Sequence, residues 1–564
     1  MNWKRIFKAV ILAMIISCIS GCGQEKEKDR IEEALEETGA FEGIDSHETG
    51  EDDGNTDEGG GGYLGENKDD YYETGLEGGM SGSGTEGAGE KKLETDQGNE
   101  TVDTREQGNE TSESVWDAGR EVILGDERLE EYIPLLDGKR VALFSNHTGI
   151  VGDEVTYVEN AVETRDGDEK LMQQGAGEQS QEELRFGTDS EDLSFGNNLE
   201  VLPFGFGPDG SEVIYGEHIL DVLLKQDVNV TAIFSPEHGF RGTEDAGALV
   251  DDSVDIKTGV PILSLYGSYD SHYPSEESMA QFDVLVVDMQ DVGLRYYTYY
   301  ISMYYLMDAC AAHDKEVIIL DRPNPNGFYV DGPILQDGYH SGVGQLPIPI
   351  VHGMTWGELA QMMNGEGWLN SGKDSCMLTI IPCENYTHQT KTALIRNPSP
   401  NLKDMRAVYL YASTCFFENT AFSVGRGTDY PFEIYGTPYL SGVSGYDYTF
   451  IPESMSGAAA PQFEGQTCYG KELRELTLEE IWQEQINLTY LVSAYQDLKE
   501  KRPDISFFGT PDSNGRYFLD LLCGTDEVRR MIEEGYSAEE IEGSWQKDVE
   551  TFKEQRRPYL LYEE

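Results

Sequence analysis

The chain of 564 residues is poor in basic side chains, with 41 lysines and arginines against 106 aspartates and glutamates and a formal net charge of −65. A surface of this sign repels the phosphates of nucleic acids and anionic membranes, so we expect no nucleic-acid partner. The sequence also lacks a long hydrophobic run at its N-terminus, where the apolar stretch extends only from Ala9 to Ile16. A run of that length is too short to span a bilayer as a helix.

Several motifs that mark metal, nucleotide or acyl chemistry are missing. The sequence has no C-x-x-C spacing, no phosphate-binding Walker loop, no G-x-S-x-G turn and no H-E-x-x-H pair, so we expect neither a zinc site nor a cofactor. Gly205, Gly207 and Gly210 match G-x-G-x-x-G formally. Pro208 and the acidic surroundings remove the strand, turn and helix that give this motif its meaning, and we reject it.

Cysteine is scarce, with eight residues in the whole chain. Six of them follow the first 22 residues, which leaves disulfides open in an exported protein. Cys376 and Cys383 flank an apolar run and fit two buried thiols as well as a bridge.

The N-terminus has the features of an export signal. Basic residues at Lys4, Arg5 and Lys8 precede the short apolar stretch, and Ile19-Ser20-Gly21-Cys22 follows it. The last four residues resemble a bacterial lipobox, which implies cleavage before Cys22 and lipid attachment to it. We therefore expect an exported protein anchored by lipid to the outer face of the bacterial cell membrane; the alternative is a plain signal peptide with an incidental cysteine.

Two acidic, aliphatic-poor stretches interrupt the chain and divide it into parts. Residues 23–118 are rich in Gly, Glu and Asp and predict a disordered tether, while 153–213 predict a flexible insertion. We expect four segments: a signal peptide over 1–22, the tether over 23–118, a first folded domain over 119–340 that contains the insertion, and a C-terminal domain over 341–564.

Short apolar runs rich in Val and Ile alternate with helical patterns in the first domain. The runs 140–146, 230–236, 283–290 and 316–323 are typical of parallel strands buried on both faces. Residues 216–227 and 297–314 predict helices. This alternation predicts an α/β fold with right-handed crossovers.

Each predicted strand ends in polar or ionisable residues. These are Asn146 after the first strand, Glu237 and His238 after the second, Asp288, Asp291 and Arg295 after the third, and Asp321 and Arg322 after the fourth. A single polar strand end is usually a cap or a turn. Because open α/β sheets bind ligands at the carboxyl ends of their strands, four such ends indicate a functional rim.

The second half carries unusual loops. His352 lies in a loop before a helix that Thr355 and Glu358 predict as a capping box. A Pro-Asn loop contains Arg396 and Asn401, and a glycine-punctuated loop contains Arg426.

These motifs, in this order, carry a family resemblance. The set SPEHGFRG, DMQDVGLRYYTY, LDRPNPNG, PIPIVHGMTWGELA, PSPN and SVGRGTDYPFE, closing with EIEGSWQKDVETFKEQRRPYLLY, resembles the NamZ-type exo-β-N-acetylmuramidases of glycoside hydrolase family 171. The similarity runs from about residue 138 to the C-terminus. It implies a Rossmann-like N-terminal domain, a smaller α/β C-terminal domain and an active site in the cleft between them.

The resemblance also implies a substrate, since family members release N-acetylmuramic acid from the non-reducing ends of peptidoglycan fragments. The glutamate proposed as catalytic in the family falls on Glu237. Where the family more often has a Glu-Gly-Thr-Asn type run, this chain reads Glu418-Asn419-Thr420-Ala421, which leaves contacts from that loop open.

Glycoside cleavage needs an acid and, in most families, a second carboxylate. We expect Glu237 to be the acid and one of Asp288, Asp291 and Asp321 to be its partner; a route through the substrate's own acetamido group stays open. The lactyl carboxylate of muramic acid favours a guanidinium partner, for which Arg295, Arg322, Arg396 and Arg426 are candidates. We expect further sugar contacts from the side chains of Asn146, His238, Asp321, His352 and Asn401.

Two other classes of function remain open from the residues alone. A lipid-anchored protein that binds muropeptide sugars without turnover would use the same rim. An acyl hydrolase with Ser235 or His238 is a weaker alternative, because Pro236 removes a backbone N–H that an oxyanion hole commonly uses.

Overall fold

The structure is a computed structural model that describes residues 122–157, 213–236, 240, 253–263, 265, 273–373 and 375–564. All of them belong to Gly108–Glu564, the second of two units into which the chain divides. Cys22, the tether over 23–118, most of the predicted insertion, and the segment with Glu237 and His238 lie outside the described residues. In the ranges that the structure does describe, no helix is long and apolar enough to cross a membrane.

A seven-stranded sheet organises the first half of the described chain. Its strand order is β5-β6-β4-β1-β7-β8-β9, and every neighbouring pair is parallel except β5 with β6. The strands are β1 (Val141–Ser145), β4 (Val230–Phe234), β5 (Ser253–Val254), β6 (Pro261–Leu263), β7 (Val284–Asp288), β8 (Glu316–Leu320) and β9 (Met377–Ile381). The four strands expected from apolar runs are therefore confirmed as β4, β1, β7 and β8, side by side at the centre.

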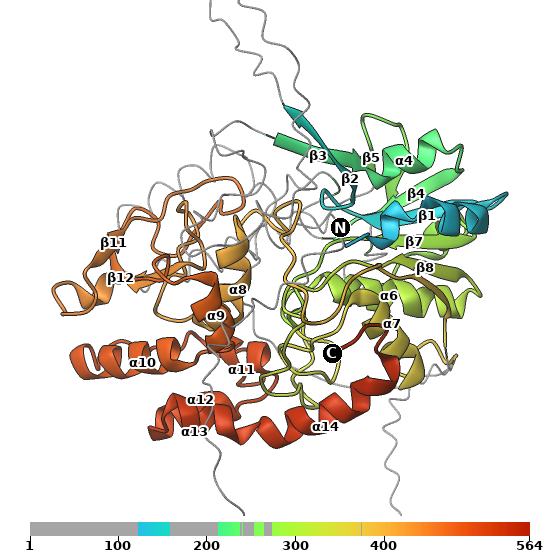
Figure 1. Cartoon of the computed structure of the whole chain (residues 1–564). Helices are drawn as coiled ribbons and strands as arrows, with labels where there is room; N and C mark the ends of the chain where they lie inside the picture. The colour runs from blue at the N-terminus through green and yellow to red at the C-terminus, as the bar shows by residue number, and fades with distance from the viewer. Residues whose placement is uncertain are drawn as a thin grey trace, which may run out of the picture. The chain divides into compact units, whose positions relative to one another are not determined.

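Helices cover both faces of this sheet (Figure 1). Ala142 and Phe144 of β1 point into a core with α6 (Tyr299–Ala312) and α7 (Trp356–Gly365). Their neighbours Val141 and Leu143 point into a second core, with α3 (Leu129–Tyr132), η2 (Ile133–Leu136) and α4 (Ile219–Lys225). Because both faces are buried, these strands read as continuous apolar runs, and the predicted α/β class is confirmed.

The helix expected over 216–227 begins later than its pattern indicates. Residues up to His218 form β3 (Val213–His218), which pairs antiparallel with β2 (Ile150–Tyr157). Gly216 has a φ of 59°, and a side chain there would collide with the carbonyls of Val151 and Gly152. The ring of His218 accepts a hydrogen bond from the N–H of Leu220, so α4 begins at Ile219. The capping box of Thr355 and Glu358 on α7 is confirmed.

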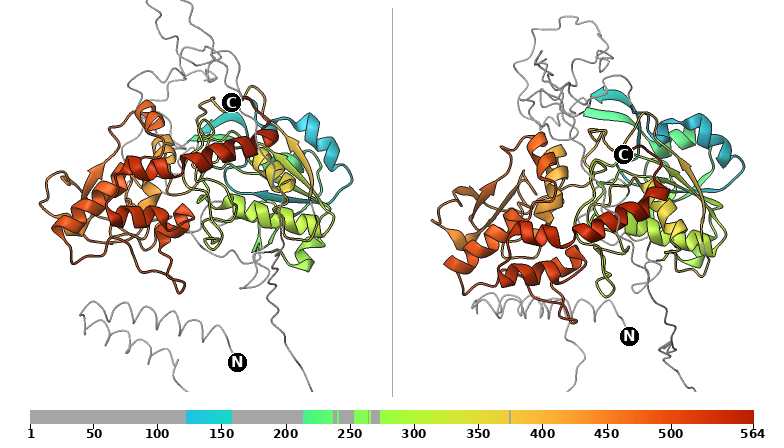
Figure 2. Two further views of the ribbon diagram at one scale, coloured as in Figure 1. Left: turned by 90° about the horizontal axis from the view of Figure 1, so that it is seen from below. Right: turned by 60° about the horizontal axis from the view of Figure 1, so that its bottom comes forward.

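The second half combines helices with a small antiparallel sheet of order β10-β12-β11. Its strands are β10 (Ile434–Thr437), β11 (Tyr448–Phe450) and β12 (Cys468–Glu472), and its helices are α8 (Met405–Thr414), η3 (Cys415–Phe417), η4 (Pro438–Leu440), α9 (Leu478–Glu484), α10 (Thr489–Lys501), α11 (Phe518–Cys523), α12 (Glu527–Glu534), α13 (Ala538–Ser544), α14 (Gln546–Arg556) and η5 (Arg557–Tyr559). Two short helices, η1 (Gly125–Glu127) and α5 (Glu276–Met279), complete the first half. In both views of Figure 2, α14 leads from the helices of the second half back toward the large sheet.

Cysteine pairing was left open by the sequence. Each of the six described cysteines, Cys376 and Cys383 included, is a buried free thiol. The described cysteines therefore contribute to packing rather than to crosslinking.

Candidate active site

The carboxyl ends of β4, β1 and β7 lie level with one another. Phe144 of β1 pairs with Phe234 of β4, and Ser145 pairs with Asp288 of β7. The residues that follow these strands therefore emerge at one edge of the sheet, as expected for a binding rim. The description of β4 stops at Pro236, and Glu237 and His238 lie outside the described residues.

Asn146 and Thr148 join two of these strand ends. Both are buried, and Oδ1 of Asn146 accepts hydrogen bonds from the backbone N–H and the hydroxyl of Thr148 at 2.9 and 2.6 Å. The Thr148 hydroxyl accepts one from the N–H of Gln290 after β7, at 3.0 Å. Asn146 thus links the end of β1, through Thr148, to the backbone that follows β7. The substrate contact that we expected of Asn146 stays a prediction.

Asp288 is fully buried and engaged by Arg322. The Nε and Nη2 of Arg322 donate to the two carboxylate oxygens of Asp288 at 2.6 and 3.1 Å, and Nη2 also donates to Asp126. Burial raises the pKa of both carboxyls, and the Arg322 charge opposes that rise. Since its oxygens are held in this way, Asp288 is a poor candidate for the second catalytic carboxylate. Asp126 was missed from the sequence, where nothing in its surroundings marks it.

Asp321 is also occupied, because it anchors the start of α7. Its Oδ1 accepts from the N–H of Gly357 at 2.9 Å, and its Oδ2 accepts from the hydroxyls of Thr355 and Tyr562 at 2.7 and 2.6 Å. Burial raises its pKa to about 6. Asp321 thus has a structural role at the start of α7, and the sugar contact that we expected of it stays a prediction.

Asp291 differs from the other two carboxylates. Its Oδ1 accepts from the N–H of Gly293 at 2.6 Å, while its buried Oδ2 accepts no hydrogen bond from the described residues. Both Asp291 and Trp356 line a cavity of about 10 Å³, room for about one water molecule. Burial raises the pKa of Asp291 to about 7, and the Trp356 indole partly opposes this rise without closing a hydrogen bond of normal geometry. Of the three carboxylates predicted as partners of Glu237, Asp291 is therefore the one with an oxygen that no described group binds.

Arg295 and His352 are enclosed. Arg295 is fully buried and donates to the carbonyls of Pro333, Ile348 and Leu522. It joins these loops, so the substrate contact that we expected of Arg295 is not supported by its surroundings. The ring of His352 is 1% exposed and accepts from the N–H of Met354, and burial lowers its pKa to about 3, so it packs as a neutral ring.

The Pro-Asn loop of the second half reaches the rim. The ring of His147 bonds to the carbonyl of Asn397 at 2.8 Å, and the hydroxyl of Tyr297 donates to that of Pro398 at 2.6 Å. These contacts bring the half-buried Arg396 into the neighbourhood of the rim. Asn401 is buried and donates to the carbonyl of Gly457, which ties this loop to the second half.

A row of aromatic rings connects Arg426 with the rim. The rings of Tyr297 and Tyr411 are 6.4 Å apart, those of Tyr411 and Phe432 are 4.6 Å apart, and the Arg426 guanidinium lies 5.0 Å from the centre of the Phe432 ring. Nε of Arg426 donates to Glu418 at 2.8 Å, and 28% of the Arg426 side chain is exposed. Of the four predicted arginines, Arg426 has a side chain that is both oriented by Glu418 and partly exposed.

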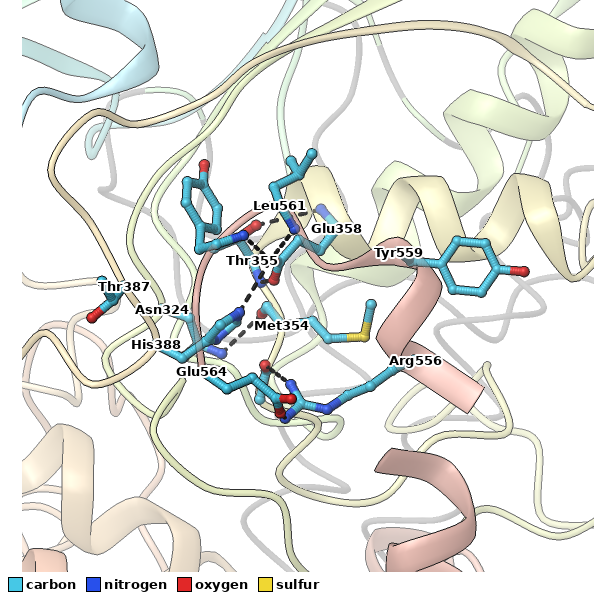
Figure 3. A network of polar contacts seen from close by, with 12 residues as sticks. Asn324, Met354, Thr355, Glu358, Thr387, His388, Arg556, Tyr559, Leu561 and Glu564 are labelled. Atoms are coloured by element: carbon cyan, nitrogen blue, oxygen red, sulfur yellow. Dashed lines mark hydrogen bonds and ion pairs between the residues drawn. The ribbon is translucent and has the colours of Figure 1, made fainter. Parts of the chain in front are cut away.

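The C-terminal residues are bound beside the rim (Figure 3). The buried Glu358 accepts from the N–H of Leu561 at 2.8 Å and from the ring of His388 at 3.1 Å. Arg556 at the end of α14 donates to the carbonyl of Gly353 and to Glu564. These bonds fix the loop before α7, and with it Trp356 of the cavity.

No group of three or more His, Cys, Asp or Glu side chains in the described ranges could hold a metal ion.

Several known proteins are similar to this chain. A family model for the N-terminal part of the exo-β-N-acetylmuramidase NamZ matches residues 211–406, and its C-terminal companion matches 409–562. The peptidoglycan β-N-acetylmuramidase NamZ of Bacillus subtilis strain 168 is 34% identical over 358 residues, which cover 61% of this chain and 82% of that protein.

Two solved structures of DUF1343 family proteins from Bacteroides fragilis NCTC 9343 are similar to the chain. One is 47% identical with a TM-score of 0.60 and covers 79% of this chain and 100% of its own. The other is 25% identical with a TM-score of 0.57 and covers 78% of this chain and 99% of its own. Together with the two family models, these matches show that the chain belongs to the NamZ family of exo-β-N-acetylmuramidases.

Proposed function

We propose that the protein is an exo-acting glycoside hydrolase that releases N-acetylmuramic acid from the non-reducing ends of peptidoglycan fragments. Family membership supports the reaction class, and the B. subtilis relative is named a peptidoglycan β-N-acetylmuramidase. The observation that carries the proposal is Asp291, a rim carboxyl with one unoccupied oxygen beside a cavity for about one water molecule. A hydrolase needs such a group, whereas a protein that only binds sugar does not.

Two carboxyl groups divide the chemistry. Glu237, by the resemblance of its SPEHG segment, protonates the leaving oxygen. Asp291 is the second carboxylate, because Asp288 and Asp321 are held by other side chains. With a pKa of about 7, Asp291 is ionised in a large fraction of molecules at neutral pH and can accept a proton from water or orient the substrate's acetamido group.

Selectivity for muramic acid is assigned to Arg426. The lactyl carboxylate distinguishes this sugar from N-acetylglucosamine, and a guanidinium pairs with a carboxylate through two parallel hydrogen bonds. Glu418 binds Nε of Arg426, which leaves the outer nitrogens for a ligand.

The protein acts at the membrane surface, anchored through lipid on Cys22. The basic start, the short apolar stretch and Ile19-Ser20-Gly21-Cys22 support this proposal, and the Gly-rich acidic residues 23–118 supply the reach. Incorporation of a labelled fatty acid into the full chain, lost on Cys22→Ala, is the expected result; equal labelling of both would contradict it.

The reaction is tested with a chromogenic β-N-acetylmuraminide and the matching N-acetylglucosaminide. We expect release from the muraminide alone, abolished by Glu237→Gln. If neither is cleaved while N-acetylmuramic acid still binds, the protein is a sugar-binding lipoprotein and the proposal fails.

A further inference from the structure

Asp126 lies inside the candidate active site although it precedes the sheet. Its side chain is fully buried, Oδ2 accepts a hydrogen bond from Nη2 of Arg322, and Oδ1 has no hydrogen-bond partner among the described residues. The family model begins at residue 211, so Asp126 is outside the matched span.

Backbone hydrogen bonds attach the chain around Asp126 to the residues that follow β8 and β9. Ile123 and Glu384 exchange two backbone hydrogen bonds of 3.1 and 2.9 Å, and the N–H of Gly125 donates to the carbonyl of Asp321 at 3.0 Å. A side chain at Gly125 would lie 2.3 Å from the carbonyl oxygen of Ile381, so only glycine allows this approach. The backbone therefore delivers Asp126 to one fixed place.

Arg322 is held from two sides. Asp288 binds it from within the sheet, and Asp126 binds it from the preceding segment. All three side chains are buried, and an arginine that loses Asp126 keeps its ion pair with Asp288 but is no longer held from the second side. Arg322 also lines the small cavity beside Asp291. A shift of the Arg322 side chain therefore changes the surroundings of Asp291, the second catalytic carboxylate of the proposed function.

We propose that Asp126 is a positioning residue of the active site, which acts by holding Arg322 against Asp288 beside the Asp291 cavity. This inference rests on the proposed function. It makes the segment that links the predicted tether to the sheet part of the catalytic arrangement. Asp126 has no contact with substrate in this role.

The test compares the full chain with Asp126→Asn, which keeps the size and removes the charge. We expect kcat on the chromogenic muraminide to fall at least about tenfold with KM changed less than about twofold, because displaced active-site groups slow the chemical step. Asp331→Asn is the matched control, since Asp331 is also buried but binds Trp545 in the second half. The control should lower the melting temperature and leave kcat unchanged.

Coupling distinguishes positioning from general support of the fold. If Asp126 acts through Arg322, the kcat loss from Asp126→Asn should largely disappear in an Arg322→Gln background. Full additivity of the two losses, or a wild-type kcat in Asp126→Asn, overturns the inference. Should the Asn variant not fold, Asp126→Glu keeps the charge and shifts the carboxylate; a kcat loss supports the inference and a wild-type kcat overturns it.

The unmodified chain separates the two proposals. If it does not cleave the muraminide, the proposed function fails and the positioning role fails with it. If it cleaves and Asp126→Asn is equally active, only the role of Asp126 is wrong.

Discussion

The phenol of Tyr562 donates a hydrogen bond of 2.6 Å to Oδ2 of Asp321, across 241 positions of sequence. Asp321 follows β8 at its carboxyl end, and Tyr562 is two residues before the last one that the structure describes. The backbone N–H of Leu561 is bound by Glu358 of α7 at the same place. The C-terminal residues thus complete the buried polar contacts at this edge of the sheet.

We expect Tyr562→Phe to lower the free energy of unfolding by about 1–3 kcal/mol, because the buried Asp321 carboxyl loses one of its three donors. Urea denaturation measures the change. Tyr559→Phe is the control, since its hydroxyl bonds to Glu366 at the surface, and we expect a loss of less than about 0.5 kcal/mol. Equal losses of unfolding free energy in the two variants would show that the hydrogen bond to Asp321 stabilises the fold no more than a surface hydrogen bond does.

Asp291→Asn should reduce kcat on the muraminide by about 10²-fold or more, because the amide cannot accept the proton that the carboxylate takes. KM should change little, since the amide has nearly the same size. Steady-state kinetics of the two proteins check this, with Asp331→Asn, a buried carboxyl that binds Trp545, as the control. A kcat within threefold of the wild type would remove Asp291 from the mechanism.

The same carboxyl makes stability depend on pH. In the unfolded chain Asp291 titrates near the usual aspartate pKa of about 4, whereas burial raises the folded pKa to about 7. The folded protein holds this proton more tightly, so the stability that it contributes is full below about pH 4 and is lost as the pH rises through about 7.

Between pH 5 and pH 8 the melting temperature of the wild type should therefore fall further than that of Asp291→Asn. The pKa of Asp321 is also raised by burial, to about 6, but Asp321 is present in both proteins and its effect cancels in the comparison. Calorimetry at the two pH values measures the difference. If the melting temperatures of the two proteins change equally between pH 5 and pH 8, burial does not raise the pKa of Asp291 in the folded protein.

The sequence predicted the elements better than the roles of side chains. The strands β1, β4, β7 and β8 follow from apolar runs, because burial on both faces requires apolar side chains at every position. Arg295 shares a motif with Asp291, yet its guanidinium turns inward to three carbonyls that come from residues up to 227 positions away. Asp126 meets Arg322 across 196 positions. Motifs identify residues that gather at an edge of the sheet, but tertiary packing decides which of them stay available to a ligand.

Arg426 provides the last test, which concerns selectivity. A charge-assisted pair with the lactyl carboxylate contributes about 1.5–3 kcal/mol, so Arg426→Gln should weaken binding of N-acetylmuramic acid at least about tenfold. N-acetylglucosamine has no such carboxylate, and its affinity should stay the same. Titration calorimetry with both sugars measures this, and Arg406→Gln, which removes a guanidinium 3.6 Å from Glu433, controls for loss of a charge in the second half. If both sugars bind more weakly to Arg426→Gln, the residue supports the loop through Glu418 and Phe432 rather than selecting the substrate, because only a direct contact distinguishes the two sugars.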